Sequence, residues 1–241
     1  MRTVFVGPSL AGRLDDVRRL DPELVIAGPA VWGDVARAVI HGAKVIGIID
    51  GCFEQTRAVW HKEILYALSQ GVTVAGAASM GALRAAECAA FGMIGIGRIF
   101  ELYAGGELSD DSDVALVHAP AELGYLPLSE PRVNVMATLS AMRGAGLLSP
   151  LEYRTARAAA QRLHYSELSH LAVINAAGIA DLRRVQRLTA WANRHREDLK
   201  QRDALALIDW IRTCPEAAGE KPRWTFSESS QWQALMQELR A

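Results

Sequence analysis

The sequence predicts an α/β protein, with a mostly parallel sheet and flanking helices followed by an all-helical C-terminal subdomain. In the first half, short β-branched apolar runs alternate with helical patterns, which is typical of parallel strands covered on both faces. After about residue 120, Pro120, Pro127 and Pro131 precede a run of helical periodicity with hardly any strand signal. We therefore expect an α/β core over residues 1–125 and a helical region over 126–241 that packs on this core.

Four strands are expected in the first half, because four apolar runs each end in a turn rich in glycine or other small residues. The runs cover residues 4–6, 24–27, 45–49 and 72–75, and the turns follow at 7–9, 28–30, 50–51 and 76–79. Sites in open α/β sheets gather at the carboxyl ends of strands. These turns are therefore where we expect functional residues.

Helices are expected wherever apolar residues recur at helical spacing. In the core these segments are 31–40, 59–68 and 80–91, which end near Gly42, Gly71 and Gly92. Glycine can adopt the left-handed turn that closes a helix, which supports these boundaries. The C-terminal segments are 132–143, 150–163, 167–177, 181–200, 203–213 and one near 228–239.

The composition favours a soluble, cytoplasmic protein. Half of the residues are hydrophobic, which allows a substantial buried core, and the formal net charge of −1 gives no global electrostatic reason to bind nucleic acid or an anionic membrane. The start of the chain lacks a signal-peptide pattern, and no apolar stretch approaches the ~20 residues of a membrane span. Cys52, Cys88 and Cys214 are too scattered for a disulfide framework or a metal site, which indicates a reducing compartment.

The turn around Ser79 is the main candidate for a catalytic site. Ala77 stands two residues before this serine and Gly81 two residues after it, where a strand gives way to a helix. Small residues at these positions permit the tight turn of a nucleophile elbow, which presents a serine hydroxyl and points the N–H of Met80 at a developing oxyanion. Alternatively, Ser79 is simply the N-cap of the helix, a position that serine favours.

A serine nucleophile needs a base, and the candidates upstream are His61 and Lys62. A lysine can act as base only when burial or a nearby positive charge lowers its pKa from about 10.4 toward neutrality. On a helical wheel, Trp60, Ile64 and Leu68 belong to the apolar stripe and Lys62 points the other way. The wheel by itself therefore predicts a solvated lysine.

At these residues the chain resembles the TfuA-like family, through several motifs in that family's order and spacing. The motifs are GPSL at 7–10, IIDG at 48–51, VWHKEIL at 59–65, GAASMGALRAAE at 76–87 and GM at 92–93. They lie within roughly residues 3–120 and are specific as a set. Cys52 departs from the family, in which an aromatic residue often follows Asp-Gly, and Ser112 interrupts an acidic stretch. No motif beyond about residue 125 matches, so nothing transfers onto that part of the chain.

The resemblance implies a role in peptide backbone thioamidation. Members of the family accompany YcaO-type enzymes, which use ATP to activate an amide of a precursor peptide so that sulfur replaces the oxygen. The family is understood to hydrolyse the C-terminal thiocarboxylate of a small ThiS-like sulfur carrier, which liberates sulfide, and to help the YcaO enzyme engage its peptide. We expect neither a cofactor nor a metal ion.

The family's hydrolase-like site is a Ser-Lys pair, which falls on Ser79 and Lys62 in this sequence. The resemblance implies that Ser79 attacks the thiocarboxylate carbon and forms an acyl-enzyme, which water then releases. Lys62 would take the serine proton and return one to the departing sulfur. N–H groups at the turn, from Met80 and Gly81, would hold the developing negative charge.

Neighbouring residues are candidates for supporting or partner-binding roles. Asp50 and Gly51 end a strand and would shape the site wall or orient the lysine, although Asp-Gly is also an ordinary turn. Arg84 is close enough in sequence to Ser79 to meet a carrier's carboxyl end, or forms only a helix-surface ion pair with Glu87. Cys52 is either a persulfide carrier or a small half-buried residue.

Two charged segments and two further functions complete the sequence-based hypotheses. The acidic stretch 107–113 lacks the spacing of a calcium loop, so a solvated loop is expected. Basic residues give the predicted 181–202 helix a positive surface, for an acidic partner or for solvent. These residues are Arg183, Arg184, Arg187, Arg194, Arg196, Lys200 and Arg202.

Two other functions are alternatives to a hydrolase. One is a non-catalytic adaptor that holds the YcaO enzyme, carrier and peptide together. The other is a nucleotide binder, for which a Walker motif and GxGxxG are lacking.

Overall fold

The computed structural model describes residues 1–52, 56–216 and 222–240, and it forms two compact units. The sheet unit combines Met1–Leu108 with Gln201–Ala241, and the helical unit is Ser109–Lys200. This division differs from the predicted ranges 1–125 and 126–241. The chain leaves the sheet unit and later returns to it, because the helix Leu199–Thr213 packs on the sheet and the helix Ser230–Arg240 packs on helices that cover it.

The sheet unit is built on a five-stranded parallel sheet in the order β2-β1-β3-β4-β5. Its strands are β1 (Arg2–Phe5), β2 (Val25–Ala27), β3 (Val45–Ile48), β4 (Thr73–Ala77) and β5 (Ile94–Ile96). The predicted α/β class is confirmed, and the four expected strands are β1 to β4. The sequence does not predict β5, because a three-residue strand with a central glycine gives little signal. Gly95 is needed there, since an added Cβ would lie 2.1 Å from the ring of Phe100.

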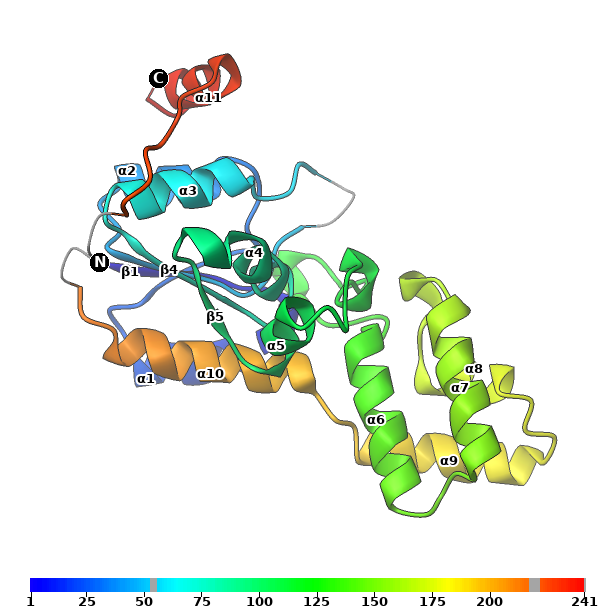
Figure 1. The fold of residues 1–241 in the computed structure, drawn as a ribbon. Helices are drawn as coiled ribbons and strands as arrows, with labels where there is room; N and C mark the ends of the chain where they lie inside the picture. The colour runs from blue at the N-terminus through cyan, green and yellow to red at the C-terminus, as the bar shows by residue number, and fades with distance from the viewer. Residues whose placement is uncertain (53–55, 217–221, 241) are drawn as a thin grey trace. The chain divides into compact units, whose positions relative to one another are not determined.

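Helices cover both faces of this sheet (Figure 1). They are α1 (Leu14–Leu20), α2 (Asp34–Ile40), α3 (His61–Ser69), α4 (Met80–Cys88), α5 (Arg98–Ala104), α10 (Leu199–Thr213) and α11 (Ser230–Arg240). α1 and α10 pack on one face, and α2, α3 and α4 pack on the other. Right-handed crossovers explain the split, because the chain moves from β1 to β2 in one direction and from β2 to β5 in the other.

α10 returns to the sheet because one of its faces is apolar. The buried residues of that face are Ala204, Leu207, Ile208 and Ile211. A carboxylate adds a polar anchor, since Asp203 accepts a hydrogen bond from the N–H of Ile99 at 2.7 Å. Gly97 makes room for it, because an added Cβ would lie 2.3 Å from the Asp203 carboxyl carbon. The helix thus closes the α1 face of the sheet.

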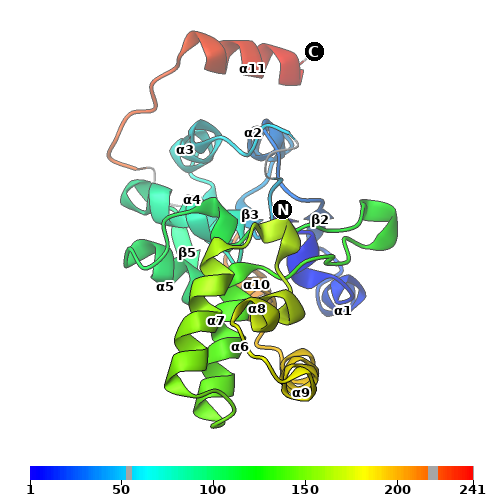
Figure 2. The ribbon, with the colours of Figure 1, turned by 90° about the vertical axis from the view of Figure 1, so that its right-hand side faces the viewer.

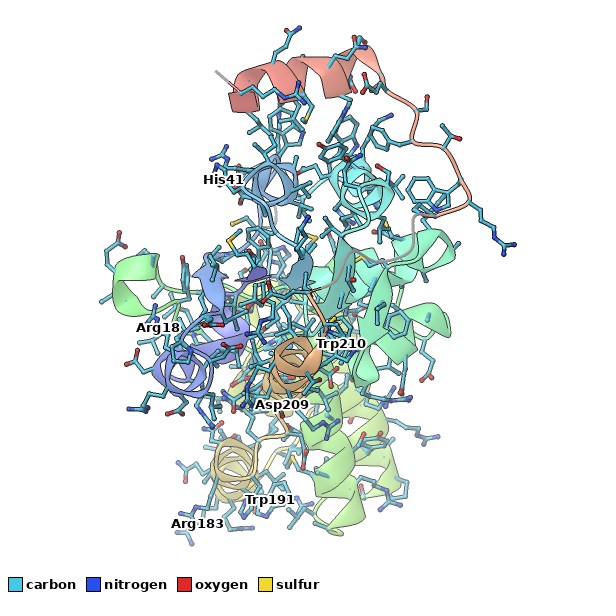
Figure 3. All side chains as sticks on the ribbon, turned by 90° about the vertical axis from the view of Figure 1, so that its left-hand side faces the viewer. Arg18, His41, Arg183, Trp191, Asp209 and Trp210 are labelled. Atoms are coloured by element: carbon cyan, nitrogen blue, oxygen red, sulfur yellow. The ribbon has the colours of Figure 1, made fainter. Side chains whose placement is uncertain are left out.

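α11 packs on α2 and α3, and side chains fill the space between these helices (Figure 3). Trp232 is 1% exposed and forms the centre of this contact. Leu235 and Leu239 approach Gly33 at the start of α2, at 3.5 and 3.6 Å from where a Cβ would lie. The C-terminal helix is therefore an added layer outside α2 and α3.

The helical unit contains α6 (Arg132–Gly144), α7 (Pro150–Arg162), α8 (His170–Ala176) and α9 (Leu182–Arg194), and Figure 2 shows these four helices. These helices pack around a core of their own that includes Leu139, Met142 and Leu168. The predicted segments 132–143, 150–163 and 167–177 correspond to α6, α7 and α8. The predicted helix 181–200 is interrupted, because α9 ends at Arg194 and the next helix begins at Leu199.

The interruption changes the expected positive surface of 181–202. Arg184 donates two hydrogen bonds to Glu152, and Arg196 pairs with Glu130 and another carboxylate of the same unit. Lys200 is buried, and its Nζ donates to the carbonyl of Val114 at 2.8 Å. Several of the seven basic residues therefore have structural partners, and they do not share one helix.

The acidic stretch 107–113 is a structured loop. The side chain of Asp110 accepts the N–H of Ser112 at 2.8 Å, which caps a short 3-10 helix at Asp111–Asp113. Asp113 pairs with Arg132 at the start of α6 at 2.9 Å. Among the described helices, none combines the length and apolar character that a bilayer span needs.

Candidate active site

Asp50 lies at the centre of the sheet's carboxyl edge, between β1 and β4. In this strand order the connections after β1 and β3 run in opposite directions, and ligands of open α/β sheets bind at such a switch point. Asp50 follows β3 and is 1% exposed. Its carboxylate accepts hydrogen bonds from the N–H of Gly7 at 2.9 Å, the N–H of Ser9 at 3.0 Å and the Ser9 hydroxyl at 2.7 Å. Asp50 therefore fixes the loop after β1, as a wall of the expected site.

Ser9 is a site residue that the sequence analysis did not select. It lies in the turn that follows β1, is 4% exposed, and reaches across the switch point to Asp50. Its position in the GPSL motif was the available signal, but a serine after Gly-Pro is also common in turns. Only the strand order shows that this turn and Asp50 are neighbours.

The turn at Ser79 is sharp and strained. β4 ends at Ala77 and α4 begins at Met80, so two residues make the connection. Ala78 has a φ of 65°, which is unusual for a residue with a Cβ, and the N–H of Ser79 donates to the carbonyl of Ala77 at 2.7 Å. Such local strain is often found at functional sites.

Ser79 occupies the N-cap position of α4, but its hydroxyl makes no capping hydrogen bond. The residue is 1% exposed. The N-cap alternative therefore explains the position of Ser79 and not its hydroxyl. The N–H of Met80 has no backbone acceptor within the described residues, so a donor lies next to this hydroxyl in the chain.

Three glycines let α4 lie directly against the ends of β3 and β4. A Cβ on Gly81 would lie 1.7 Å from the carbonyl oxygen of Ile48, and one on Gly76 would lie 2.0 Å from the carbonyl oxygen of Gly81. A Cβ on Gly51 would lie 2.7 Å from Cγ of Met80. The N–H of Gly81 donates to the carbonyl of Ile49 at 3.2 Å. Gly81 therefore shapes the turn, and its amide is already engaged as a donor, unlike that of Met80.

Lys62 lies in the first turn of α3 with its amine directed at an aromatic ring. Its Nζ is 5.3 Å from the ring centroid of Phe226, in the segment that precedes α11. The side chain is half-buried, and the apolar stripe through Ile64 and Leu68 faces the core, as the wheel predicts. Lys62 and Ser79 are not joined by a hydrogen bond. The Ser-Lys pair therefore stays a prediction.

His61, Arg84 and Glu87 form one cluster that ties α3 to α4. Oε2 of Glu87 is 2.7 Å from Nε2 of His61 and 2.6 Å from an Arg84 guanidinium nitrogen. Arg84 also donates to the carbonyl of Val59 at 3.1 Å. The expected pair of Arg84 and Glu87 is present, and His61 is part of it. The cluster therefore links α3 to α4, and a partner-binding role of Arg84 stays a prediction.

Glu63 is a second residue that the sequence analysis left without a role. It is fully buried, and its carboxylate accepts hydrogen bonds from the N–H of Gly33 at 2.8 Å, of Trp60 at 3.1 Å and of Ala36 at 3.3 Å. These donors belong to the starts of both α2 and α3. Burial raises the pKa of Glu63, while the three backbone hydrogen bonds oppose that rise. A glutamate three residues after an N-cap is the signal that predicts such a role.

Cys52 and Cys88 have the properties of structural residues. Burial raises the pKa of the Cys52 thiol, and the carboxylates of Asp34 and Asp50 raise it further. Burial likewise raises the pKa of Cys88 to about 11. A thiol with a raised pKa carries little nucleophilic thiolate. In the part of the chain that the structure describes, no three His, Cys, Asp or Glu side chains gather into a group that could hold a metal ion.

A family model described as TfuA-like protein matches residues 50–169, which is about half of the chain. The match includes Asp50, Lys62 and Ser79, and it extends from the sheet unit into the helical unit. No curated protein matches the chain. The motifs, the parallel sheet that presents them and the family match agree, and the chain belongs to the TfuA-like family.

Proposed function

We propose that this protein hydrolyses the C-terminal thiocarboxylate of a ubiquitin-like, ThiS-like sulfur carrier and supplies the sulfide to a YcaO-type enzyme that thioamidates a precursor peptide. We further propose that it docks on this enzyme. The observation that carries the proposal is the strained turn at Ser79, whose hydroxyl makes no capping bond and is followed by the N–H of Met80. A hydroxyl and an adjacent backbone donor are two of the parts that acyl transfer needs, and a base is the third.

The proposed reaction proceeds through an acyl-enzyme on Ser79. The serine oxygen attacks the thiocarboxylate carbon while a base takes the hydroxyl proton. The N–H of Met80 stabilises the oxyanion of the tetrahedral intermediate. The carbon–sulfur bond then breaks, and the sulfur leaves as hydrosulfide after it receives a proton. Water hydrolyses the ester in a second step and leaves an ordinary carboxylate on the carrier.

Lys62 is the proposed base, on the strength of the family's Ser-Lys pair. It must act as a neutral amine, and it must leave its present contact with Phe226 to meet the hydroxyl. Asp50 supports the site by holding the loop after β1 in place. Buried donors and acceptors that are already paired keep a site in one geometry without further ordering on substrate binding.

The nucleophile is tested with the Ser79→Ala variant and a thiocarboxylated carrier, by measuring sulfide release. We expect a loss of about 10³-fold or more, because a nucleophile has no substitute in covalent catalysis. Ser69→Ala is a matched control, since this serine lies at the end of α3, where its hydroxyl donates to the carbonyl of Tyr66 and accepts from the side chain of Gln70. Undiminished release from Ser79→Ala would remove Ser79 as the nucleophile.

A non-catalytic adaptor is the second candidate function, and the position of the Lys62 amine on Phe226 favours it. In this case the chain holds the YcaO enzyme, the carrier and the peptide together. The adaptor predicts that Lys62→Ala keeps full thioamidation, whereas the hydrolase predicts a loss with complex formation intact. Thioamide yield and co-purification of the three partners separate the two functions.

A further inference from the structure

The segment before α11 lies on the helix layer with one face. Side chains alternate along it: Pro222, Trp224 and Phe226 are partly buried, whereas the residues between them are exposed. This alternation places one side of the segment against the helices, with a bend at Arg223 and Trp224. We call residues 222–240, which comprise this segment and α11, the C-terminal strap.

The strap crosses the outer side of α4, α3 and α2 in that order. Nε1 of Trp224 donates to the carbonyl of Phe91, just after α4, at 3.1 Å, and the two rings meet edge to face with centroids 5.8 Å apart. Phe226 contacts Tyr66 of α3 at 5.8 Å between ring centroids. Trp232 of α11 then packs on Tyr66 at 4.8 Å and on α2. Aromatic contacts thus fix the strap at three points.

Lys62 lies at the second of these points. It is four residues before Tyr66, so both side chains emerge on the outward face of α3. The Lys62 amine stands over the Phe226 ring at 5.3 Å, within the range of a cation–π contact. The ring face attracts an ammonium and gives no comparable attraction to a neutral amine. The contact therefore holds the position of the amine.

We propose that Phe226 is a positioning residue that holds Lys62 in a resting state, and that release from the strap makes this amine available for chemistry. The claim that the released amine becomes available for chemistry rests on the proposed function, because Ser79 would use it. The claim that Phe226 holds Lys62 does not, since it concerns only the contact between Lys62 and the strap. A cation–π contact at a partly exposed site is weak, so release is a small step.

The restraint is tested by competitive acetylation of the whole protein with limiting reagent, with the Lys62 rate measured by mass spectrometry relative to Lys44. Lys44 is exposed and reports reagent access in the same molecule, and the buried Lys200 reports that the fold is intact. In Phe226→Leu, which keeps the apolar packing and removes the ring, we expect about a two- to fivefold faster relative rate. An unchanged rate overturns the proposal.

Two further variants separate the contact from general loosening of the strap. Phe226→Tyr keeps a ring face and should retain the wild-type rate. Trp224→Leu loosens the same strap at Phe91 without touching Lys62, and it should leave the rate unchanged. Equal acceleration in Trp224→Leu and Phe226→Leu would show that the strap only shields the lysine, and the role of Phe226 would be withdrawn.

Sulfide release tests the claim that Lys62, once free of Phe226, takes part in the reaction at Ser79. Phe226→Leu should release sulfide faster, and Phe226→Leu combined with Lys62→Ala should lose that gain. If Ser79→Ala keeps full release, the proposed function fails while the acetylation result stands. If Ser79→Ala is inactive and Phe226→Leu accelerates labelling without accelerating release, the hydrolase stands and the resting-state role fails.

Discussion

At the scale of single residues, the candidate site depends on backbone positions that have no room for a side chain. Gly51, Gly76 and Gly81 each occupy a place where a Cβ would lie 2.7 Å or less from a neighbouring atom. Their joint effect is to bring the start of α4 against the ends of β3 and β4. The turn at Ser79 is strained because this approach leaves two residues, Ala78 and Ser79, to connect strand and helix.

Gly81→Ala should therefore destabilise the sheet unit strongly. The new Cβ would lie 1.7 Å from the carbonyl oxygen of Ile48, a backbone atom that cannot move without distorting β3. We expect a loss of about 3 kcal/mol or more in the free energy of unfolding, measured by urea denaturation. Gly144→Ala is the control, because no atom lies within 4 Å of its Cβ and alanine is the better helix former. Equal stability of the two variants would contradict the packing argument.

For the candidate site, the sequence predicts which residues are candidates for chemistry more readily than it predicts which residues they contact. The motifs around Asp50, Lys62 and Ser79 are legible in the sequence because strand ends and small-residue turns have clear signatures. The partners of these residues come from distant parts of the chain: Ser9 for Asp50 and Phe226 for Lys62. No local pattern specifies such a partner, so the sequence does not predict it.

At the scale of secondary-structure elements, carboxylates join helices at their ends. Glu63 accepts hydrogen bonds at the starts of α2 and α3, and Glu152 forms a capping box with Ser149 at the start of α7. Glu152 also accepts two hydrogen bonds from Arg184 of α9. Each carboxylate therefore satisfies the free N–H groups of one helix and fixes a second helix to it.

Glu152 should make the helical unit acid-sensitive. The hydrogen bonds of Arg184 lower the pKa of this carboxyl to about 2, from 4.5. Because the folded pKa lies below the unfolded one, the unfolded chain takes up the proton first. The stabilisation is present above pH 4.5 and is lost as the pH falls through about 2. We expect a loss of about 1–2 kcal/mol, since the pair is partly exposed and therefore screened.

This pH dependence is measured by urea unfolding between pH 5 and 2, with helix content as the signal. Glu152→Gln should be less stable than wild type at pH 5, and the difference should shrink toward pH 2. A constant difference across this range would show that the charge of Glu152 does not contribute. Glu122→Gln is a suitable control, because this glutamate is exposed in a short 3-10 helix, Ala121–Leu123, of the same unit.

Element boundaries followed local sequence where a cap or an apolar stripe was clear, and tertiary contacts elsewhere. The strands β1 to β4 and the helices α6 to α8 lie close to their predicted ranges. The predicted helix 181–200 is broken, since Lys200 turns inward to the carbonyl of Val114 and Arg196 reaches Glu130. β5 forms because it pairs with the edge of β4, and a three-residue segment is too short for its sequence to predict a strand.

At the scale of the whole molecule, the sheet unit is built from two stretches of the chain, and the helical unit lies between them in the sequence. α1 and α10 together cover one face of the sheet, although they are far apart in sequence. Pairings over such separations carry a large entropic cost of loop closure, which their apolar burial must exceed. The stability of the sheet unit therefore depends on residues beyond 200.

Leu207→Ala tests this dependence. Leu207 is fully buried, and its Cδ2 lies 2.7 Å from where a Cβ of Gly47 would be, so it fills the space that this glycine leaves on β3. We expect a loss of about 2–5 kcal/mol in the free energy of unfolding, because the truncation opens a cavity against the sheet. Leu182→Ala in α9 removes the same atoms at a residue that is 74% exposed, and it should change stability by less than about 0.5 kcal/mol. A loss in Leu207→Ala as small as that expected for Leu182→Ala would mean that α10 is not needed as a cover.

The sequence by itself determined the α/β class, the turns at which chemistry is expected and the family to which the chain belongs. These features rest on local periodicity and on motifs of adjacent residues, which a linear chain displays directly. Tertiary structure alone decided that Ser9 meets Asp50, that α10 closes the sheet and that Phe226 holds Lys62. Each of these contacts joins residues more than 40 positions apart or depends on the strand order. They arise from packing of the whole chain, which no short stretch of sequence encodes.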